Sequence, residues 1–470
     1  MQLVFEVDSL ENRTGRIDCH YFDPRYYATV EKLRMLSQTS KFKITILGSL
    51  LNENSKTKLT GGATPRGAVY VSEGVKFIRV QNVQPNKLEL KNMVFINYAT
   101  HENLLKRSKL KPHDIILTIT GTYGVACVVP NDIGDANINQ HCVKIEVDKT
   151  KINSYYLSCF LNSGLCKRQM DRTVTGSSRP ALDYPAIRAL LIVHSPSIEE
   201  QENAVKPIQK METEAYDKIR TADELIDKEH SLLLELLKVN LPAKSSQASF
   251  EVNPNTLSDR IDAVYYNPAY DELIKSLKRG AYPCEPLHKL ATIDTRRINP
   301  HDFPDTSYKY VELDNIDGNL GLITVKKEAF GIELSKGPKT LFHSGQILLS
   351  KLRYYLRKIA LVPQEFDDGI GSPEFHTLTC FENVEPFFLT SVLRHKIVIE
   401  QTEHKATGSS RPRLTENDIK SIWIPRPSFD VQRNIATKIL NLHSQVIKLR
   451  EEAGRLLGTA RQRLEEHLSC

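Results

Sequence analysis

The chain has 470 residues, of which 40% are hydrophobic and 26% are charged, and this predicts a globular protein with two or more domains. No apolar run reaches membrane-spanning length, and the first ten residues lack the basic and then apolar layout of a secretory signal. We therefore expect a cytoplasmic protein that does not contact a membrane. The eight cysteines are irregularly spaced, without a CxxC pair, which favours reduced, mostly buried thiols over a zinc site.

The first half of the chain has the pattern of short strands followed by helices. Apolar, β-branched runs predict strands at 75–83, 114–120 and 142–147, and a helical piece is expected at 154–164. Polar loops separate the strands. This order predicts an α+β fold.

A long helix is predicted at 197–240. Ser197 and Glu200, three residues apart, have the sequence of a capping box. Pro207 lies inside the pattern and is expected to kink or delay the helix, because proline has no backbone N–H. The apolar positions recur at spacings of three and four, as in helices that pair along a seam. They are Val205, Ile208, Ala215, Ile219, Ala222, Ile226, Leu233 and Leu236.

The second half repeats this order, with strands expected at 308–313, 346–351 and 359–363. The loop 350–358 between the last two contains four basic residues interleaved with two tyrosines. Its cations could neutralise phosphates or bind guanine edges. A solvated strand end is the alternative interpretation.

A second long helix, predicted at 428–470, ends the chain. Its apolar residues again follow a heptad-like pattern. Gly454 and Gly458 within it suggest either a close backbone approach or simply a weaker helix. The apolar positions are Ile435, Leu442, Val446, Leu449, Ala453, Leu456 and Ala460.

The two halves are related by an internal repeat. The hexamer TGSSRP occupies 175–180 and again 407–412. Other landmarks match at nearly the same offset and in the same order, which indicates a duplication with diverged contents between the landmarks. They include Gln201 with Gln432, Asn203 with Asn434, RIDCHYFDPRY (16–26) with RIDAVYYNPAY (260–270), and His141 with His376.

Charge is distributed unevenly between the helices and the remainder. Residues 197–240 carry 11 acidic and 6 basic residues, net −5, and residues 428–469 carry 5 acidic and 7 basic residues, net +2. Opposite bias favours an antiparallel pair of these two helices. Because the whole chain is +6, the residues outside the helices total +9, as expected of domains that bind a polyanion.

The hexamer has the residue types of a phosphate or base contact. Its glycine lets backbone amides approach a partner, its serines donate hydrogen bonds, and its arginine (Arg179 or Arg411) supplies a planar cation. The proline restricts the arginine backbone to extended conformations. A structural turn whose arginine braces the following helix fits the same residues equally well.

Taken in order, these motifs resemble the specificity subunit of Type I restriction-modification systems. The resemblance rests on two diverged units of about 180 residues. Each unit has a TGSSRP-like loop and a glutamine at the start of a helix (IEEQ, FDVQ). In addition, the segment 60–83, TGGATPRGAVYVSEGVKFIRVQNV, resembles the first conserved recognition segment of that family. The resemblance implies two pseudo-symmetric mixed α/β target-recognition domains separated by an antiparallel, coiled-coil-like pair of long helices. The expected boundaries are target-recognition domain 1 at 1–196, a spacer helix at 197–240, a linker at 241–250, target-recognition domain 2 at 251–427 and a second spacer helix at 428–470.

The resemblance also implies a function without chemistry in this chain. Each domain would read one half of a bipartite, asymmetric double-stranded DNA target, and the helices would set the gap. Two methyltransferase subunits and restriction subunits would dock on the chain. AdoMet, ATP and Mg²⁺ are expected only on those partners, and no metal is expected here.

DNA-binding residues are carried over by position from the family's motifs. The second domain has no G-x-T-P segment, so its first recognition loop cannot be placed in this way. In domain 1 the expected contacts are Thr64, Arg66, Tyr123, Ser177, Ser178 and Arg179; in domain 2 they are Lys351, Arg353, Tyr354, Arg357, Ser409, Ser410 and Arg411.

Enzymatic alternatives are disfavoured by the sequence. Asn267-Pro268-Ala269-Tyr270 resembles the N-P-P-Y signature of amino-methyltransferases, but its repeat partner YFDPRY indicates a structural landmark, and no glycine-rich cofactor loop opens a helix. Compact nuclease carboxylates and a Walker loop are also lacking. The remaining alternatives are the specificity subunit of a fused Type IIB-like restriction-methylation enzyme, a self-contained DNA-binding regulator, and a scaffold for unrelated proteins.

Overall fold

A computed structural model describes residues 21, 23–37, 41–64, 70–175, 180–242, 249–252, 262–324, 327–408 and 410–469. The chain forms two compact units, and each takes part of both long helices, α5 (Ile198–Leu237) and α10 (Phe429–Ser469). Unit 1 comprises 1–217 and 452–470, and unit 2 comprises 218–451. The division therefore falls inside the helices, and the domain boundaries given above stay a prediction.

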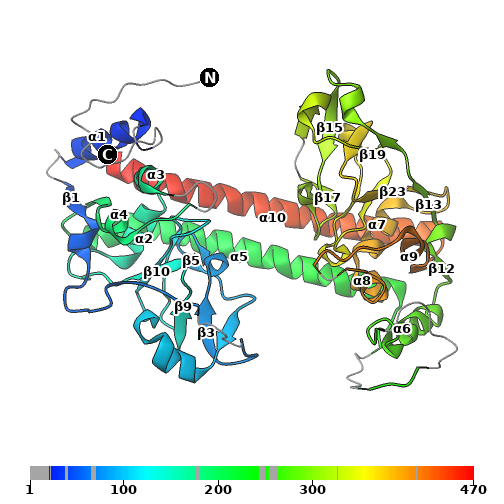
Figure 1. The fold of residues 1–470 in the computed structure, drawn as a ribbon, viewed down its shortest axis with the longest axis horizontal. Coiled ribbons are helices and arrows are strands. Elements are labelled where there is room, and N and C mark those ends of the chain that lie inside the picture. Colours follow the sequence, from blue (N-terminus) through cyan, green and yellow to red (C-terminus); the bar gives the residue numbers. More distant parts are fainter. Residues whose placement is uncertain are drawn as a thin grey trace. The chain divides into compact units, whose positions relative to one another are not determined.

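Unit 1 combines mixed strands with short helices, as an α+β fold requires (Figure 1). Its sheets have the strand orders β1-β11, β2-β10-β7-β8, β6-β3-β9 and β4-β5. The strands are β1 (Lys43–Ile46), β2 (Leu59–Gly61), β3 (Val75–Ile78), β4 (Val83–Gln84), β5 (Lys87–Leu88), β6 (Val94–Ile96), β7 (Ile115–Thr118), β8 (Ala126–Val128), β9 (Ala136–Ile138), β10 (Cys142–Ile145) and β11 (Leu191–His194). The short helices are α1 (Pro24–Ser37), α2 (Ser154–Leu161), α3 (Gly164–Thr173) and α4 (Tyr184–Arg188).

Unit 2 repeats this topology and extends one sheet. Its strand orders are β12-β24, β13-β23-β20-β21, β14-β19-β22-β15-β18 and β16-β17. The strands are β12 (Cys284–Pro286), β13 (Ala291–Asp294), β14 (Arg297–Ile298), β15 (Ser307–Val311), β16 (Ile316–Asp317), β17 (Leu322–Ile323), β18 (Lys327–Phe330), β19 (Lys339–Phe342), β20 (Ile347–Ser350), β21 (Ile359–Leu361), β22 (Gly369–Gly371), β23 (Phe375–Cys380) and β24 (Trp423–Pro425). The short helices are α6 (Pro268–Lys278), α7 (Pro386–Arg394), α8 (Lys396–Glu403) and α9 (Glu416–Lys420).

The long helices pair inside each unit through their apolar positions. In unit 1, Val205 and Ile208 of α5 share a core with Ala460, Leu464 and Leu468 of α10. In unit 2, the cores join residues 233 and 237 to residues 435 and 439, and residues 222 and 226 to residue 446. In unit 2 the residue numbers rise along one helix as they fall along the other, so the two helices are antiparallel there, as expected.

A repeated glutamine ties the start of each long helix to its domain. Gln201 Nε2 donates to the Ser195 carbonyl (2.8 Å), and its Oε1 accepts from the Asn153 amide (2.8 Å). Gln432 makes the same two bonds, to the Pro427 carbonyl (2.9 Å) and from the Glu385 amide (2.9 Å). The matching glutamines are therefore clamps that satisfy buried backbone groups just before the helix and at the N-terminal end of α2 or α7.

The ends and interior of the long helices differ in three details from the sequence prediction. Helix α5 starts at Ile198 and runs through Pro207, so the proline does not delay it. Ser197 Oγ accepts from the Glu200 amide (3.3 Å), but the Glu200 carboxylate accepts from Ser195 Oγ, so the capping box is incomplete. The two glycines of α10 make no close approach, because a Cβ at either would meet no described atom within 4 Å.

Replacing Gly454 and Gly458 with alanine should therefore stabilise the protein. Each substitution is expected to raise the free energy of unfolding by about 0.8–1.0 kcal/mol, because alanine loses less backbone entropy in a helix interior. Urea denaturation of the two single variants measures this. A loss of stability would contradict the open space found around both positions.

Two further findings concern the chain as a whole. Each of the six cysteines that the structure describes has a free thiol, and Cys127, Cys142, Cys159 and Cys166 are buried. Burial raises the pKa of Cys142 to about 12, so that thiol is unreactive at neutral pH. Among the described helices, none combines the length and apolar character needed to cross a membrane.

Candidate nucleic-acid interface

The hexamer loops (175–180 and 407–412) are closed by the same pair of backbone hydrogen bonds in both units. In unit 1 the Thr175 amide donates to the Ala181 carbonyl (3.1 Å), and the Ala181 amide donates back (2.9 Å). In unit 2 Thr407 and Arg413 exchange equivalent bonds of 3.0 and 2.9 Å. Gly408 has φ +99°, a conformation that favours glycine and lets the loop turn.

Each hexamer loop is joined to the hairpin that follows the central strand of the neighbouring sheet. In unit 1 the Gly121 amide donates to the Pro180 carbonyl (3.2 Å), beyond the end of β7. In unit 2 the Arg353 amide donates to the Pro412 carbonyl (2.8 Å), beyond the end of β20. The repeat thus preserves a two-loop surface: one hexamer loop beside one hairpin loop.

The two-loop surface of unit 2 gathers positive charge. Arg413 makes a two-point ion pair with Glu374, with Nη2–Oε1 at 2.7 Å and Nε–Oε2 at 3.1 Å. The hydrogen bonds from Arg413 lower the pKa of Glu374. Burial opposes this shift, and the charges of Arg413, Lys351 and Arg411 add to it. Arg353 reaches the loop itself, because its Nη2 donates to the Ser410 carbonyl (3.0 Å). Four cations, Arg297, Lys351, Arg411 and Arg413, thus interact electrostatically with one carboxylate, Glu374, and Arg411 and Ser410 are exposed.

Lys351 is half-buried at the base of this cluster. Burial lowers its pKa, and the neighbouring charges of Arg297 and Arg413 lower it further, while Glu374 opposes them. The charged form of Lys351 is disfavoured by burial and by the neighbouring arginines. A bound anion would stabilise that charged form, because its negative charge offsets the repulsion among the cations. The cluster is suited to a phosphate or to the acceptor edge of a guanine.

Two of the predicted unit 2 contacts point into the protein. Tyr354 is 5% exposed and its hydroxyl donates to the Leu393 carbonyl (2.9 Å). Arg357 Nη1 donates to His230 Nε2 on α5 (2.7 Å). The structure does not support Tyr354 as a DNA contact, because its polar atom is already satisfied inside the core, and it gives Arg357 a bracing contact with the long helix.

The neighbouring Tyr355 is the exposed tyrosine of this loop, at 54%. Tyr355 occupies the position in unit 2 that Tyr123 occupies in unit 1. Each tyrosine follows by two residues the amide, of Gly121 or Arg353, that donates to the hexamer proline carbonyl. The unit 2 hairpin is one residue longer, because Leu117 pairs with Ala126 whereas Leu349 pairs with Ile359. The sequence alone did not single out Tyr355, although its alignment with Tyr123 was visible at the repeat offset.

In unit 1 the described candidates are held by neighbours within the unit. The Tyr123 hydroxyl donates to Asp171 (2.8 Å), and Lys167 Nζ lies 3.5 Å from the ring centroid. Burial, followed by the Asp171 hydrogen bond, raises the Tyr123 pKa well above its ordinary value. Thr64 is exposed and its hydroxyl donates to Gln140. The other candidates, Arg66, Ser177, Ser178, Arg179 and Ser409, lie outside the described residues.

The two histidines that the sequence pairs are not equivalent in the fold. The Ile119 amide donates to the His141 carbonyl, and the corresponding Lys351 amide donates to the Glu374 carbonyl. The register therefore aligns His141 with Glu374, not with His376. His376 lies in β23 and is 8% exposed.

The methyltransferase-like tetrapeptide caps a helix. Asn267 Oδ1 accepts from the Ala269 amide (3.0 Å) at the start of α6, and Tyr270 stacks on His404 with 4.0 Å between ring centroids. Asp23 caps α1 in a similar way by accepting from the Arg25 amide (2.9 Å). Both copies of the landmark begin a helix, as a structural motif would.

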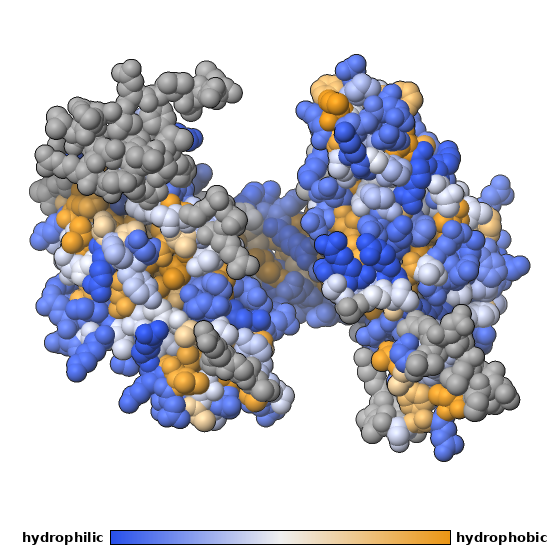
Figure 2. All heavy atoms as spheres, in the orientation of Figure 1, coloured by the Kyte–Doolittle hydropathy of each residue, from blue (hydrophilic) through white to orange (hydrophobic). Residues whose placement is uncertain are grey.

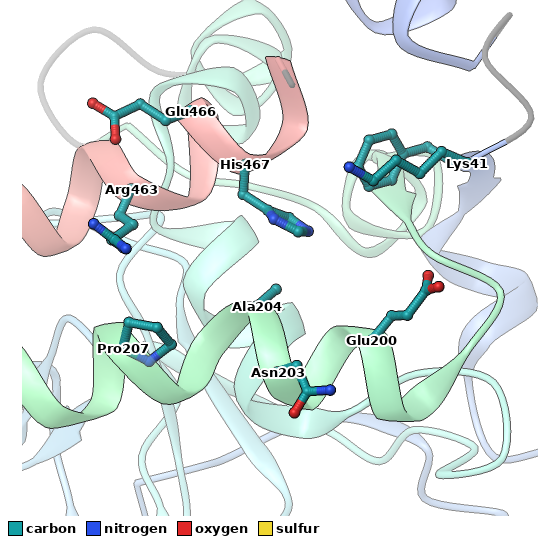
Figure 3. Close-up of a pocket in the computed structure, with 9 residues that line it drawn as sticks. Lys41, Glu200, Asn203, Ala204, Pro207, Arg463, Glu466 and His467 are labelled. Atoms are coloured by element: carbon teal, nitrogen blue, oxygen red, sulfur yellow. The ribbon is translucent and has the colours of Figure 1, made fainter.

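The structure contains two other features that could bind a ligand. His343, Asp367 and Asp368 bring possible metal-ligand atoms within 4.8 Å of one another, but His343 Nδ1 lies 2.8 Å from Asp368 Oδ1, which a plain ion pair on an exposed turn explains. In unit 1 a groove of about 600 Å³ lies between the start of α5 and the end of α10 (Figure 3). Lys41, Arg463 and His467 line it together with Glu200 and Glu466. Because both signs of charge line it, the groove selects neither anions nor cations.

Comparisons with known proteins relate the chain to one family. The family model described as Type I restriction modification DNA specificity domain matches residues 55–222. The specificity subunit of the Type I restriction enzyme EcoBI from Escherichia coli is 26% identical over 167 residues, which are 36% of this chain and 34% of that protein. The alignment thus spans about a third of the relative's length.

The solved structures that match most of the chain have low sequence identity and TM-scores below 0.5. The S subunit of a Type I restriction-modification system from M. genitalium is 11% identical with a TM-score of 0.45, covering 90% of this chain and 96% of that one. A structure titled for complex assembly and conformational transition of the type I R-M system is 14% identical with a TM-score of 0.45, covering 92% and 98%. The segment that the family model matches includes the first hexamer loop and the strands β7 and β10. Residues 55–222 of the chain are thus similar to the Type I restriction modification DNA specificity domain.

Proposed function

We propose that this protein is the DNA specificity subunit of a Type I restriction-modification complex. Unit 1 and unit 2 each read one half of a bipartite, asymmetric double-stranded DNA target. The chain carries out no chemistry, and AdoMet, ATP and Mg²⁺ act on the two methyltransferase subunits and on the restriction subunits that dock on it. The observation that carries the proposal is the two-loop surface, which equivalent backbone hydrogen bonds hold in both units. The two-loop surface of unit 1 lies within the segment that the family model matches.

The charge of the unit 2 surface supports DNA as the ligand. Four cations around one carboxylate leave a net positive site, and its exposed member, Arg411, has the planar donor geometry that binds two acceptors of guanine or a phosphate. The surfaces differ in their side chains: Ala181 stands in unit 1 where Arg413 stands in unit 2. Different side chains on the same frame fit two different half-sites.

A specificity subunit should be encoded beside a methyltransferase gene, so co-expression of this chain with the product of such a neighbouring gene tests the proposal. We expect the two products to copurify with two methyltransferase copies per chain, and methylome sequencing of the host to give one bipartite motif. A chain that purifies alone and binds a specific DNA sequence tightly would be a self-contained regulator. Cleavage on both sides of the methylated motif would identify the fused Type IIB-like alternative.

Arg411→Ala should weaken recognition of one half-site. Loss of its contact is expected to reduce affinity for the methylome-defined target by about 10- to 100-fold, because a bidentate base contact contributes roughly 1–3 kcal/mol. Fluorescence anisotropy with the intact target and with each half scrambled measures this. The affinity of the variant should no longer depend on the unit 2 half-site.

Lys275→Ala is the matched control, because Lys275 is an exposed cation of unit 2 that pairs with Glu272 on α6. It should bind like the unmodified protein. An equal loss for Arg411→Ala on unrelated DNA, with a smaller salt dependence, would assign Arg411 to a phosphate. Unchanged affinity on every DNA would remove Arg411 from the interface.

A further inference from the structure

The unit 2 hairpin loop (351–358) contains a turn with an unusual backbone. Arg353 and Arg357 adopt left-handed conformations, with φ +48° and +56°, on either side of the 3-10 turn Tyr354–Leu356. Residues other than glycine keep such conformations only where surrounding contacts hold them. The turn exposes Tyr355 and directs Arg353 towards the hexamer loop. It packs against α8, and Figure 2 shows a strongly hydrophilic area of unit 2 beside that helix. What the loop presents to a ligand therefore depends on the contacts of its turn.

One contact of the turn differs from the others in its acceptor. Three contacts end on backbone carbonyls, which accept at any pH: Arg353 N to Pro412 (2.8 Å), the Tyr354 hydroxyl to Leu393 (2.9 Å) and Lys358 Nζ to Ile316 (2.6 Å). The fourth ends on a side chain of α5, because Arg357 Nη1 donates to His230 Nε2 (2.7 Å). Since an arginine can only donate, His230 is neutral and carries its proton on Nδ1. A single proton on Nε2 therefore removes this acceptor.

Titratable groups from several elements surround His230. They are Glu229 and Asp227 on α5, Arg357 on the hairpin loop, Arg394 on α7, His395 between α7 and α8, and, beyond Glu229, His443 on α10. Burial lowers the pKa of His230, and the charge of Arg357 lowers it further, while Glu229 opposes this shift. The ring is therefore neutral at pH 7, and a proton on it places two cations at hydrogen-bond distance. Acid thus breaks the contact between the turn and α5.

The corresponding hairpin loop of unit 1 is held by different chemistry. The Tyr123 hydroxyl donates to Asp171 (2.8 Å), and Lys167 Nζ donates to the Tyr123 carbonyl (3.2 Å). Both partners lie on α3 and not on a long helix, and neither is a histidine. Mild acid should therefore release the turn of unit 2 and leave the loop of unit 1 in place.

We propose that His230 is a positioning residue for DNA recognition by unit 2: its neutral ring holds Arg357 and, through it, the turn that presents Arg353 and Tyr355 to the target. The inference rests on the proposed function and adds to it the residue of α5 that fixes the unit 2 recognition loop. Arg357 then acts by holding the turn and not by touching DNA. Because a proton on His230 releases the turn, the affinity for the unit 2 half-site depends on pH.

Fluorescence anisotropy between pH 7.5 and pH 5.5 tests the inference, with the methylome-defined target and the full chain copurified with its methyltransferase. Affinity should be constant above about pH 6.5 and fall below it by up to about 10-fold per pH unit, because the unbound protein takes up one proton that the bound protein excludes. On a target with the unit 2 half scrambled, this fall should disappear. Protonation of a histidine near the DNA surface, such as His376, adds positive charge and strengthens binding, so weaker binding in acid is specific to the release of the turn.

Variants at both ends of the contact separate its two residues. His230→Leu removes the acceptor and should lower the affinity for the intact target about 10-fold at pH 7.5, without a further fall in acid. His230→Gln should restore the affinity and abolish the pH dependence, because glutamine Oε1 lies as many bonds from Cβ as histidine Nε2 and does not titrate. Arg357→Met should cost as much as His230→Leu, and the double variant should cost no more than either, as one shared interaction requires. His288→Gln, at an exposed histidine of unit 2, is the matched control and should keep the pH dependence.

Other outcomes contradict the inference in separate ways. A loss for Arg357→Met without a loss for His230→Leu would make Arg357 a direct DNA contact. Equal losses on the target with the unit 2 half scrambled would assign the pair to the stability of the unit. A specific target bound without pH dependence would remove His230 and leave the proposed function intact, whereas an unmodified chain with no preferred DNA would overturn both proposals. If His230→Leu lowers the melting temperature, the pH profiles of the unmodified protein and His230→Gln decide, and parallel profiles overturn the inference.

Discussion

Glu229→Gln should destabilise unit 2 by about 3–5 kcal/mol, the loss expected when one partner of a buried ion pair is removed. Glu229 of α5 lies 2.8 Å from Arg394 Nη2 on α7 and accepts from His443 Nε2 on α10 at 2.7 Å. All three side chains are buried. Although burial raises the pKa of Glu229, the His443 hydrogen bond and the Arg394 charge lower it below its ordinary value, so the carboxylate is charged at neutral pH.

The reason for the large effect lies in Arg394. Its side chain is 1% exposed, and apart from Glu229 its Nη2 donates to the Asn319 carbonyl (2.9 Å). Among the described residues, Nε and Nη1 have no acceptor. A glutamine at position 229 would leave this cation buried without its counter-ion. Urea denaturation measures the change, and Glu235→Gln, an exposed position of the same helix, should cost at most about 0.5 kcal/mol.

A second variant separates the charge of this cluster from its packing. Glu229→Leu, Arg394→Met and His443→Leu combined should lie within a few kcal/mol of the unmodified protein, because apolar side chains of similar volume avoid the desolvation cost of the charges. If the triple variant is as unstable as Glu229→Gln, the loss arises from shape and not from an unpaired cation. The cluster would then be ordinary core.

Acidification from pH 7 to pH 5 should lower the stability of unit 2 by about 2 kcal/mol through His395. Burial, followed by the neighbouring charge of His230, lowers the pKa of His395 to about 3. The neutral ring has a defined tautomer, because Nε2 donates to the His230 carbonyl (3.1 Å) and Nδ1 accepts from the Ile397 amide (3.2 Å). The unfolded chain takes up a proton near pH 6.5 while the folded chain does not, so the stabilisation is complete above 6.5 and is lost progressively towards pH 3.

The measurement is the urea midpoint as a function of pH. His395→Asn can keep the bond from the Ile397 amide through its Oδ1 but loses the bond that Nε2 makes to the His230 carbonyl. The variant should be less stable at pH 7, but because asparagine does not titrate, its stability should fall by about 2 kcal/mol less on acidification from pH 7 to pH 5. His288→Asn, at an exposed position of unit 2, should follow the unmodified protein. Parallel pH curves for the unmodified protein and His395→Asn would show that His395 titrates normally. Burial and Arg357 also lower the pKa of His230, so that histidine acts in the same direction.

The sequence predicted the regular elements well where the apolar pattern is local. Strands β7, β10 and β20 fall inside the predicted ranges, because continuous β-branched and apolar runs bounded by turns have few alternatives. The long helices were also predictable, since a heptad pattern over about 40 residues exceeds chance. The parallel pairs β3–β9 and β15–β22 join strands about 60 residues apart, and no local pattern contains that information.

The candidate site was predicted less well, for a backbone reason. Whether Tyr354 or Tyr355 faces the core is decided at Arg353 and Arg357, which adopt left-handed conformations with φ +48° and +56°. Arginine rarely adopts this conformation, so the turn could not be predicted from the residue types. The glutamine clamps were visible as matching letters in the two halves, but their bonding partners lie about 50 residues away or beside the helix start and became apparent only in the fold.

The composition of unit 1 has a consequence for its synthesis. Its core contains Ala460, Leu464 and Leu468, which are translated after all of unit 2, although the rest of unit 1 is translated before unit 2. At roughly 5–20 residues per second, the chain between Asp217 and Glu452 takes about 10–50 s to translate. During that time Val205 and Ile208 lack their partners, whereas unit 2 can close as soon as Glu451 emerges. The domain whose translation begins first is thus the last to be completed, and until then the apolar positions of its helix α5 lack the residues that cover them.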